Sequence, residues 1–313
     1  MVAGVEPQLH HVEFRAMGCQ MGAWILTGDV ACARERLNLV GAWMTLVDTT
    51  LSRFNPLSEL RRLNAQPALP VRVSPLLWDA LTVALDAARA TDGLYDPTVL
   101  DGLEAAGYDR DFAAVADSDV PAAAVPSPCY TWRDIQCDPL TRTVTLPLGL
   151  RLDLSGTAKG WAAARAADML ASLGPCLVDG GGDLAVRGAL PGLDGWPIGV
   201  ADPDHPDAIL AQLTVQDRGV ATSGVDHRRW RRGTVEQHHI IDPKTRRPAA
   251  TDLRTATVIA PDATQADLYA LLVVLLGRER GYAVLAAHPD LEGLLVDCEG
   301  QRWLTPGMAP YMA

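Results

Sequence analysis

The chain is short of several features that would assign it to a familiar class of protein. Its 313 residues hold 27 Lys and Arg against 38 Asp and Glu, for a net charge of −11. Nucleic-acid recognition depends on clustered basic side chains, so this shortage of positive charge argues against it. The six cysteines form no C-x-x-C pair, which favours reduced thiols in a cytoplasmic protein over a disulfide framework.

Long apolar runs are also missing. The longest, Leu268 to Gly277, is well short of the roughly 18 residues that indicate a membrane-spanning helix. The first residues have neither a basic start nor an apolar stretch, so we expect no signal peptide or lipoprotein leader and a cytoplasmic location. With 48 % hydrophobic residues, the chain is expected to form an ordinary globular core.

Motifs of three common enzyme classes are absent from the glycine-rich segments. These are the phosphate loop G-x-x-x-x-G-K-[ST], the dinucleotide fingerprint G-x-G-x-x-G and the nucleophile elbow G-x-S-x-G. The spacing of His227, His238 and His239 matches no common zinc pattern. The sequence therefore argues against a serine hydrolase and against a common type of zinc site.

Helix signals cluster toward the two ends of the chain. Residues 31–51 carry apolar residues at helical spacing, and Ser74 followed by Pro75 predicts the start of a second helix that ends at Gly93. Another apolar helix is expected from Ala263 onward.

Short strand signals fill much of the remainder. They begin at residues 21–28 and recur from residue 142 onward, where 142–156 suggests a strand pair. Residues 101–140, rich in Pro, Ala and Asp, are expected to form an irregular insertion. Helices on either side of mostly adjacent strands predict an α+β fold.

The stretch LDLSGTAKGWAAARAADML, Leu152 to Leu170, places Lys159 at the expected start of a helix, between Gly156 and Gly160. A helix start offers unpaired N–H groups and a partial positive charge to an anion, and a lysine adds a full charge. A cation at this end of a helix is unfavourable unless an anion lies nearby, and Asp153 or a bound phosphate would serve. A solvated surface lysine is the alternative.

Three further local signals each allow two interpretations. The glycines between Asp179 and Asp183 permit close approach to a ligand, but a tight β-turn needs them equally. Tyr95, in a turn after a helix stop, could stack on a planar ring. Asp267 suits either helix capping or ligation of a hard cation such as Mg²⁺.

Taken in order, several segments resemble the motif series of the ApbE family. They run from about residue 14 to residue 277 and read FRAMGCQM, LSRFNPLSELRRLN, TDGLYDPTV, LDLSGTAKGWAAARAADML, LVDGGGDLAVRG, ATSGVDHRRW, HHIIDPKTRRPA and VIAPDATQADLYALL. Members of this family are FAD:protein FMN transferases. The resemblance implies a single domain over residues 1–313, two-lobed and T-fold-related, with mainly antiparallel sheets flanked by helices and FAD between the lobes.

The resemblance also implies a reaction. Mg²⁺ polarises the FAD diphosphate, a Thr or Ser hydroxyl of an acceptor protein attacks the FMN-side phosphorus, and AMP leaves. Two alternatives stay open: an FAD-binding relative with weak or altered activity, and an FAD pyrophosphatase that releases FMN and AMP. The sequence names neither the acceptor protein nor an oligomeric state.

Matching the motif series position by position implies a set of site residues. Lys159 and Asp267 fall on catalytic positions, and Gly156, through its carbonyl, and Asp267 fall on metal-binding positions. The FAD-binding positions fall on Met17, Phe54, Leu94, Tyr95, Asp96, Asp153, Lys159, Ile240 and Ile241. The chain departs from the family pattern at Leu271, where a metal-binding Thr is usual, at Cys19, where Thr is common, and at DGGGD, which replaces an NxGGD-like run.

Overall fold

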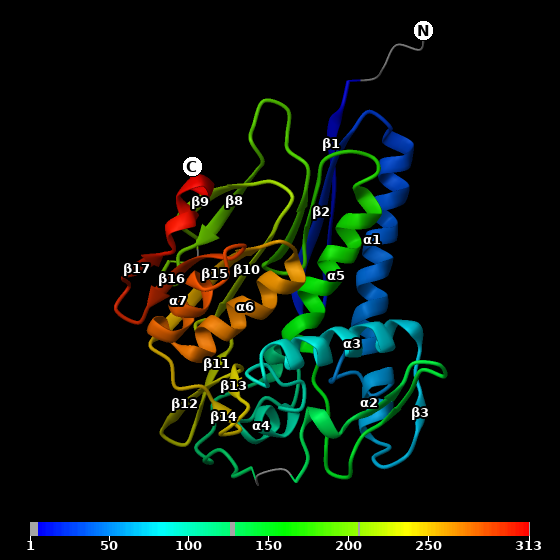
Figure 1. Ribbon diagram of the computed structural model, residues 1–313, viewed down its shortest axis with the longest axis vertical. Coiled ribbons are helices and arrows are strands. Elements are labelled where there is room, and N and C mark those ends of the chain that lie inside the picture. Colours follow the sequence, from blue (N-terminus) through cyan, green and yellow to red (C-terminus); the bar gives the residue numbers. More distant parts are fainter. Residues whose placement is uncertain (1–5, 126–128, 206, 313) are drawn as a thin grey trace. The chain divides into compact units, whose positions relative to one another are not determined.

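The computed structural model describes residues 6–125, 129–205 and 207–312 (Figure 1). The chain divides into two compact units, and each is assembled from separate stretches of sequence. Unit 1 comprises residues 1–45, 159–224 and 252–313, and unit 2 comprises residues 46–158 and 225–251. Two of the boundaries between the units fall inside the helices α1 (Val30–Leu51) and α5 (Ser155–Leu170).

Unit 1 is built on an eight-stranded sheet in which neighbouring strands run antiparallel. In sheet order the strands are β1 (Gln8–Ala16), β2 (Cys19–Thr27), β6 (Cys176–Asp179), β7 (Asp183–Arg187), β10 (Gly219–Gly224), β15 (Leu253–Ala260), β16 (Glu292–Asp297) and β17 (Arg302–Leu304). The predicted α+β class with mainly antiparallel strands is confirmed.

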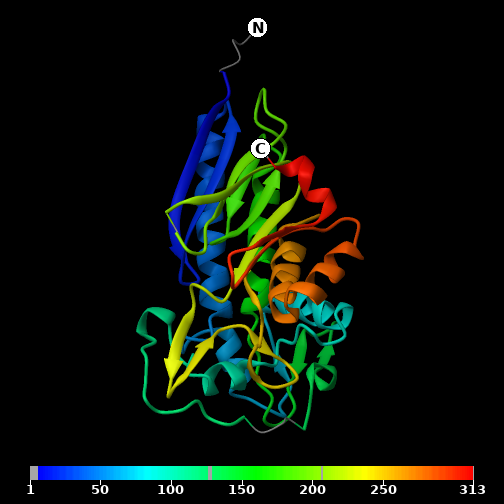
Figure 2. The same cartoon turned by 90° about the vertical axis from the view of Figure 1, so that its left-hand side faces the viewer.

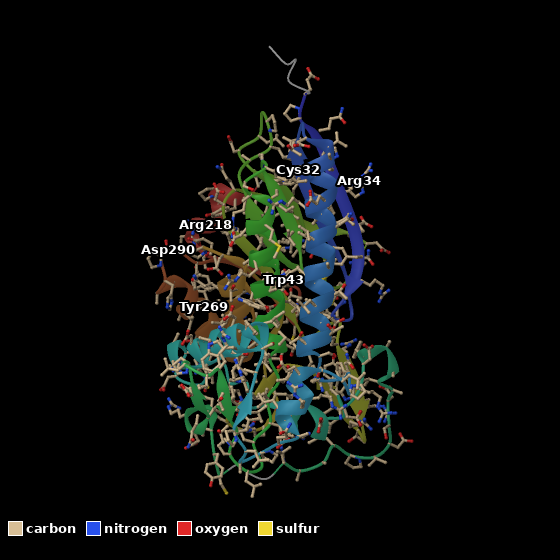
Figure 3. The ribbon with its side chains drawn as sticks, turned by 90° about the vertical axis from the view of Figure 1, so that its right-hand side faces the viewer. Cys32, Arg34, Trp43, Arg218, Tyr269 and Asp290 are labelled. Atoms are coloured by element: carbon tan, nitrogen blue, oxygen red, sulfur yellow. The ribbon has the colours of Figure 1, made fainter. Side chains whose placement is uncertain are left out.

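Helices cover one face of this sheet (Figures 1 and 2). On β6, the Cys176 thiol donates to the carbonyl of Ala167 in α5 at 3.5 Å. Nε1 of Trp43 in α1 donates to the carbonyl of Ala162 in α5 at 3.0 Å, which joins these two helices (Figure 3). Further along the sheet, α6 (Ala263–Leu276) packs on β10 and β15, and α7 (Arg278–Ala286) packs on β16.

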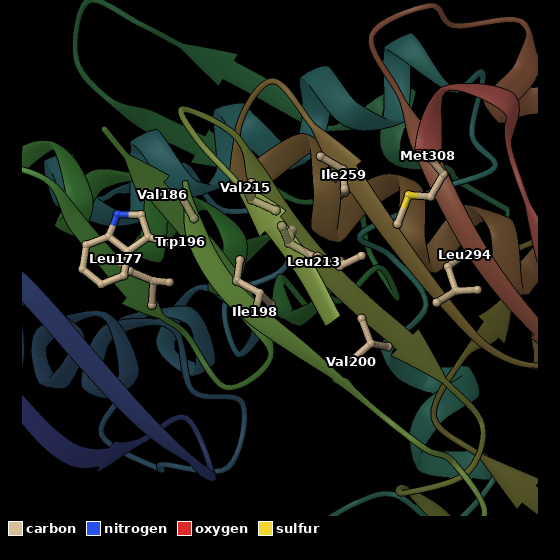
Figure 4. Close-up of a cluster of buried hydrophobic side chains, with 11 residues drawn as sticks. Leu177, Val186, Trp196, Ile198, Val200, Leu213, Val215, Ile259, Leu294 and Met308 are labelled. Carbon is tan, nitrogen blue, oxygen red and sulfur yellow. The ribbon is translucent and has the colours of Figure 1, made fainter. Parts of the chain in front are cut away.

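The opposite face of the sheet carries an apolar core under a separate hairpin (Figure 4). The hairpin consists of β8 (Trp196–Ala201) and β9 (Ile209–Val215), and the 3₁₀ helix η3 (Pro306–Tyr311) completes the cover. Side chains of β8 alternate between buried and exposed, as expected for a strand with one face in the core. The core consists of Leu177, Val186, Trp196, Ile198, Val200, Leu213, Val215, Val220, Ile259, Leu294 and Met308.

Unit 2 combines several helices with a small sheet and two hairpins. Its helices are α2 (Glu59–Asn64), α3 (Pro75–Ala90), α4 (Leu100–Ala105) and the 3₁₀ turns η1 (Phe112–Ala114) and η2 (Trp132–Asp134). A three-stranded sheet joins β3 (Val71–Arg72), β5 (Thr143–Thr145) and β4 (Gln136–Asp138), and two hairpins join β11 (Arg229–Arg232) to β12 (Val235–His238) and β13 (Ile241–Asp242) to β14 (Arg247–Pro248).

The residues at the N-terminus of α3 predicted its start correctly, whereas the helix ends at Ala90 and not at the expected Gly93. The Ser74 hydroxyl accepts a hydrogen bond from the amide of Leu77 at 3.2 Å, and Pro75 occupies the first helical position. The expected strand pair over residues 142–156 is wrong in its second half. Residues 151–154 are not a strand, and α5 begins at Ser155, whose amide donates to Oδ1 of Asp153 at 2.7 Å. Because α5 begins at Ser155, Lys159 stands in its second turn.

The segment 101–140 contains most of α4, both 3₁₀ turns and β4, with irregular chain between them. Residues 126–128 of this segment lie outside the described residues, as do residues 1–5, where we expected no leader. Within the described chain, no helix combines the length and apolar character that crossing a membrane requires.

Candidate functional site

Lys159 lies between two buried carboxylates of unit 1. Its ammonium forms an ion pair with Asp183, whose side chain is 2 % exposed against 19 % for the lysine. Burial by itself lowers the pKa of Lys159, but attraction to Asp183 and Asp267 outweighs it, and the pKa is raised above that of an ordinary lysine. The lysine is therefore a fixed positive charge. The anion beside it is Asp183, and Asp153 belongs to a different ion pair.

Asp183 closes the three-glycine turn between β6 and β7. Its carbonyl accepts from the amide of Gly180 at 2.9 Å, and Oδ1 of Asp179 accepts from the amides of Gly181 and Gly182, each at 2.7 Å. Gly181 and Gly182 have φ of 84° and 96°, a region that favours glycine. The run is thus a tight turn, as one of the two interpretations held, and it places Asp183 at the start of a central strand.

A second turn lies next to the glycine turn. Met17 and Gly18 connect β1 to β2 as a two-residue loop, with φ of 50° and 72°. A φ above zero is uncommon for methionine, and such positions concentrate at functional sites. The next residue, Cys19, lies so close to Gly181 that a Cβ added there would be 2.6 Å from the Cys19 Cβ. Met17, Cys19 and the glycine turn therefore form one neighbourhood.

Asp267 is fixed by the helix that carries Lys159. The amide of Gly160 donates to its Oδ2 at 3.1 Å, and the residue is 4 % exposed. Gly160 has to be glycine, because a Cβ there would lie 2.3 Å from the Ala263 carbonyl oxygen. Leu271, one helical turn after Asp267, is half-buried. No three His, Cys, Asp or Glu side chains of the described chain gather closely enough to hold a metal ion by themselves.

In unit 2, Asp153 pairs with Arg53. Oδ2 of Asp153 lies 2.9 Å from Nε of Arg53, and both side chains are less than a tenth exposed, at 4 % and 7 %. The guanidinium also contacts the rings of Phe54 and Tyr108, at 4.1 and 4.2 Å from their centroids, and donates to the Tyr108 carbonyl at 2.6 Å. Phe54 and Asp153, two of the predicted FAD-binding residues, are thus joined through one arginine.

The Phe54 ring belongs to a larger aromatic cluster. Its centroid lies 5.5 Å from that of Tyr108, which lies 5.5 Å from that of Trp230. Burial raises the pKa of Tyr108, against the lowering effect of Arg228 and Arg53. Ile241 joins the same apolar cluster, and the neighbouring Ile240 is buried. The cluster gives Phe54 a rigid support.

The turn after α3 carries three more of the predicted residues, Leu94, Tyr95 and Asp96. Leu94 is half-buried, whereas the other two are buried. The Tyr95 hydroxyl lies 3.3 Å from the Thr157 hydroxyl, and Oδ1 of Asp96 accepts from the amide of Thr98 at 2.8 Å. Tyr95 is 4 % exposed, so its ring offers little surface for stacking in this conformation.

Comparison with known proteins decides the family. The model of the ApbE family matches residues 17–295, most of the chain. The chain belongs to the ApbE family. Among curated relatives, an FAD:protein FMN transferase of Treponema pallidum is 32 % identical over 255 residues, which are 76 % of this chain and 70 % of the relative. One from Salmonella typhimurium is 28 % identical over 317 residues, or 98 % and 90 % of the two chains.

Solved ApbE structures share the fold. The ApbE protein of Thermotoga maritima has a TM-score of 0.86 and 25 % identity, covering 98 % of this chain and all of that one. The flavin transferase ApbE of Vibrio cholerae has a TM-score of 0.80 and 24 % identity, covering 97 % and 99 %. The second likeness concerns the fold alone.

Two charged residues, one in each unit, were not among the predicted site residues but pair with them. In the sequence, Asp183 only flanks the glycine run, and Arg53 is one residue of the segment LSRFNPLSELRRLN. Each forms a buried ion pair with a predicted site residue. A charged residue inside an otherwise apolar or glycine-rich motif was the available signal, because such a charge needs a partner when it is buried.

Proposed function

We propose that this chain transfers FMN from FAD to a Thr or Ser hydroxyl of an acceptor protein. The hydroxyl oxygen bonds to the FMN-side phosphorus, the bond from that phosphorus to the bridging oxygen breaks, AMP leaves with the bridging oxygen, and the hydroxyl proton is lost to solvent. Membership of a family whose curated relatives are named FAD:protein FMN transferase supports the reaction. The structural observation that carries it is the fixed ammonium of Lys159 beside the glycine turn.

Lys159 suits the charge that the reaction develops. Like any lysine it is protonated at neutral pH, and its raised pKa preserves that charge. A preorganised cation stabilises a diphosphate as its phosphorus is attacked. The glycine turn allows a ligand to approach the backbone closely. The remaining FAD contacts are proposed from the motif series and are Met17, Phe54, Leu94, Tyr95, Asp96, Asp153, Ile240 and Ile241.

The donor set fits a magnesium ion that takes most of its ligands from elsewhere. Mg²⁺ commonly binds one or two carboxylates and completes its shell with substrate phosphates and water. From the motif series, Asp267 is proposed to supply the carboxylate and Gly156 its carbonyl. When bound, the ion would neutralise negative charge on the diphosphate and polarise it. Asp267 already has a fixed orientation through the Gly160 amide.

One observation favours the alternative of an FAD-binding relative with altered activity. Leu271 places an apolar side chain one turn after Asp267, where an oxygen would add a ligand.

As for location, the cysteines of the described chain form no disulfide, which supports the proposal of a cytoplasmic protein.

The test uses a Salmonella typhimurium strain that lacks its own FAD:protein FMN transferase. Protein extract from this strain is incubated with the purified chain, FAD and Mg²⁺. Flavin fluorescence on a denaturing gel and release of AMP are then measured. Lys159→Ala serves as the impaired variant and Lys244→Ala, at the chain's only other lysine, as its control.

We expect a fluorescent protein band with an equivalent amount of AMP, and loss of both in Lys159→Ala alone. FMN and AMP without a labelled band would identify a pyrophosphatase and contradict the transferase. Bound, intact FAD with no AMP at saturating Mg²⁺ would contradict it as well and identify the FAD-binding alternative.

A further inference from the structure

Asp183 is held by the sheet in a position where it can fix the side chain of Lys159. It begins β7, which lies between β6 and β10 inside the eight-stranded sheet. Its backbone pairs with Ala221 of β10 and accepts from Gly180 across the turn. The carboxylate is therefore attached to one of the most constrained parts of unit 1, whereas a lysine side chain has many rotamers when nothing holds it.

The environment of the pair gives this contact its strength. Asp183 is 1 % exposed, and an ion pair in such surroundings is screened far less than one at the surface. Lys159 extends from α5, and a Cβ on Gly180 would lie 3.2 Å from the Lys159 carbonyl oxygen, so the helix and the turn are in contact. Both ends of the ion pair thus come from rigid backbone.

We propose that Asp183 is a positioning residue that holds the Lys159 ammonium in place for the diphosphate. The proposal extends the proposed function, because it assigns a role to a residue that the motif comparison left without one. Asp183 fixes the rotamer of Lys159 before FAD binds, so the conformational entropy of the lysine is not lost during the reaction. Asp267, the second carboxylate beside Lys159, then faces an ammonium of fixed position.

The reactivity of the Lys159 amine measures this contact, and a second lysine serves as an internal reference. The chain has two lysines, Lys159 and Lys244, and the second is exposed. Brief acylation with an N-hydroxysuccinimide ester, followed by mass spectrometry, reports the reactivity of each amine in the same molecule without FAD. In the unaltered protein we expect Lys159 to react at least about tenfold more slowly than Lys244, because a buried, paired amine is a poor nucleophile.

Asp183→Asn removes the charge and keeps the size of the side chain. We expect the Lys159-to-Lys244 reactivity ratio to rise at least about tenfold, and kcat to fall about 10- to 100-fold with a smaller change in the Kd of FAD. Asp183→Glu keeps the charge and should restore part of both. Asp168→Asn is the matched control. Asp168 lies in the same unit and pairs with Arg187, but its side chain is 61 % exposed.

A purely structural role gives a different result. In that case Asp183→Asn lowers the melting temperature, yet folded molecules keep an unreactive Lys159 and an unchanged kcat, and the proposal is wrong. If Asp183→Asn does not fold, Asp183→Glu decides by the same two readouts. Its longer side chain shifts the ammonium, so we expect a moderate rise in Lys159 reactivity and a moderate fall in kcat, whereas unchanged values of both would contradict the proposal. Lysine reactivity needs no FAD, so an inactive protein would count against the transferase without affecting this test.

Discussion

The backbone amide of Gly160 donates a hydrogen bond to Oδ2 of Asp267, a residue 107 positions further along the chain. This contact ties the start of α6 to the helix that carries Lys159. It depends on glycine, because a Cβ on residue 160 would lie 2.3 Å from the Ala263 carbonyl oxygen and 2.7 Å from the Asp267 Cβ. The spacing between the two helices therefore sets where Asp267 lies relative to Lys159.

Gly160→Ala should push these helices apart. Overpacking against backbone typically costs about 1 to 3 kcal/mol, which exceeds the gain of up to about 1 kcal/mol from placing alanine in a helix. Gly41→Ala in α1 is the control, because its Cβ would have only one neighbour within 4 Å, the Phe14 ring at 3.9 Å. In urea unfolding, the free energy of unfolding should fall for Gly160→Ala. It should stay the same or rise slightly for Gly41→Ala. Equal stabilities would refute the tight contact.

Gly181→Ala tests the neighbourhood of the two turns. The residue has φ of 84°, and an added Cβ would lie 2.6 Å from the Cys19 Cβ. Gly300 has a similar φ of 80°, and an added Cβ there would have nothing within 4 Å. Gly300→Ala therefore measures only the cost of placing alanine at a positive φ, roughly 1 to 2 kcal/mol. We expect Gly181→Ala to lose more stability than that and to bind FAD more weakly. If the two variants lose the same free energy of unfolding, Cys19 does not crowd the turn.

Asp267→Asn should weaken the response to magnesium. An amide cannot supply the negative charge that a hard cation prefers, so the Mg²⁺ concentration for half-maximal FAD turnover should rise at least about tenfold. Asp290→Asn, at an exposed position, should leave it unchanged (Figure 3). An unaltered magnesium titration for Asp267→Asn would remove this residue from the metal site.

Leu271→Thr tests the departure from the family pattern. Residues four apart on a helix share a face, so the variant places a hydroxyl beside Asp267. We expect half-maximal turnover at a lower Mg²⁺ concentration than in the parent. Calorimetric titration of Mg²⁺ into the FAD-saturated protein provides a measurement independent of turnover. Identical titrations of variant and parent would mean that Leu271 does not limit metal binding.

The thiol of Cys176 should be unreactive toward thiol reagents in the folded protein. Burial raises the pKa of its thiol to about 12, so roughly one molecule in ten thousand carries the thiolate at pH 8. Ellman's reagent should modify the exposed Cys129 rapidly and Cys176 only after unfolding. Because the folded state keeps a proton that the unfolded state loses above about pH 9, this thiol lowers the free energy of unfolding progressively between pH 9 and 12. Rapid modification at pH 8 would contradict its burial.

Sequence reasoning succeeded where the signal was local. Ser74 and Pro75 mark the start of α3, because capping depends on residues within one turn. It failed just before α5, where residues 151–154 alternate as in a strand but form irregular chain that leads into the helix at Ser155.

The partners of the site charges could not be predicted. Lys159 pairs with Asp183, which lies 24 residues away in the next strand pair, and Asp153 pairs with Arg53. Such pairs are selected by the packing of a sheet against helices, which no short window of sequence contains. The motif order identified the family because it samples these distant positions together.

Binding of FAD tests the central claim most directly. Equilibrium dialysis of the purified protein against FAD at saturating Mg²⁺ should show saturable binding of one FAD per chain. That binding should be retained by Lys244→Ala and weakened at least about tenfold by Lys159→Ala, because one fixed charge near a diphosphate is lost. FAD that stays wholly in solution with the unaltered protein, or that binds Lys159→Ala equally well, would contradict the account.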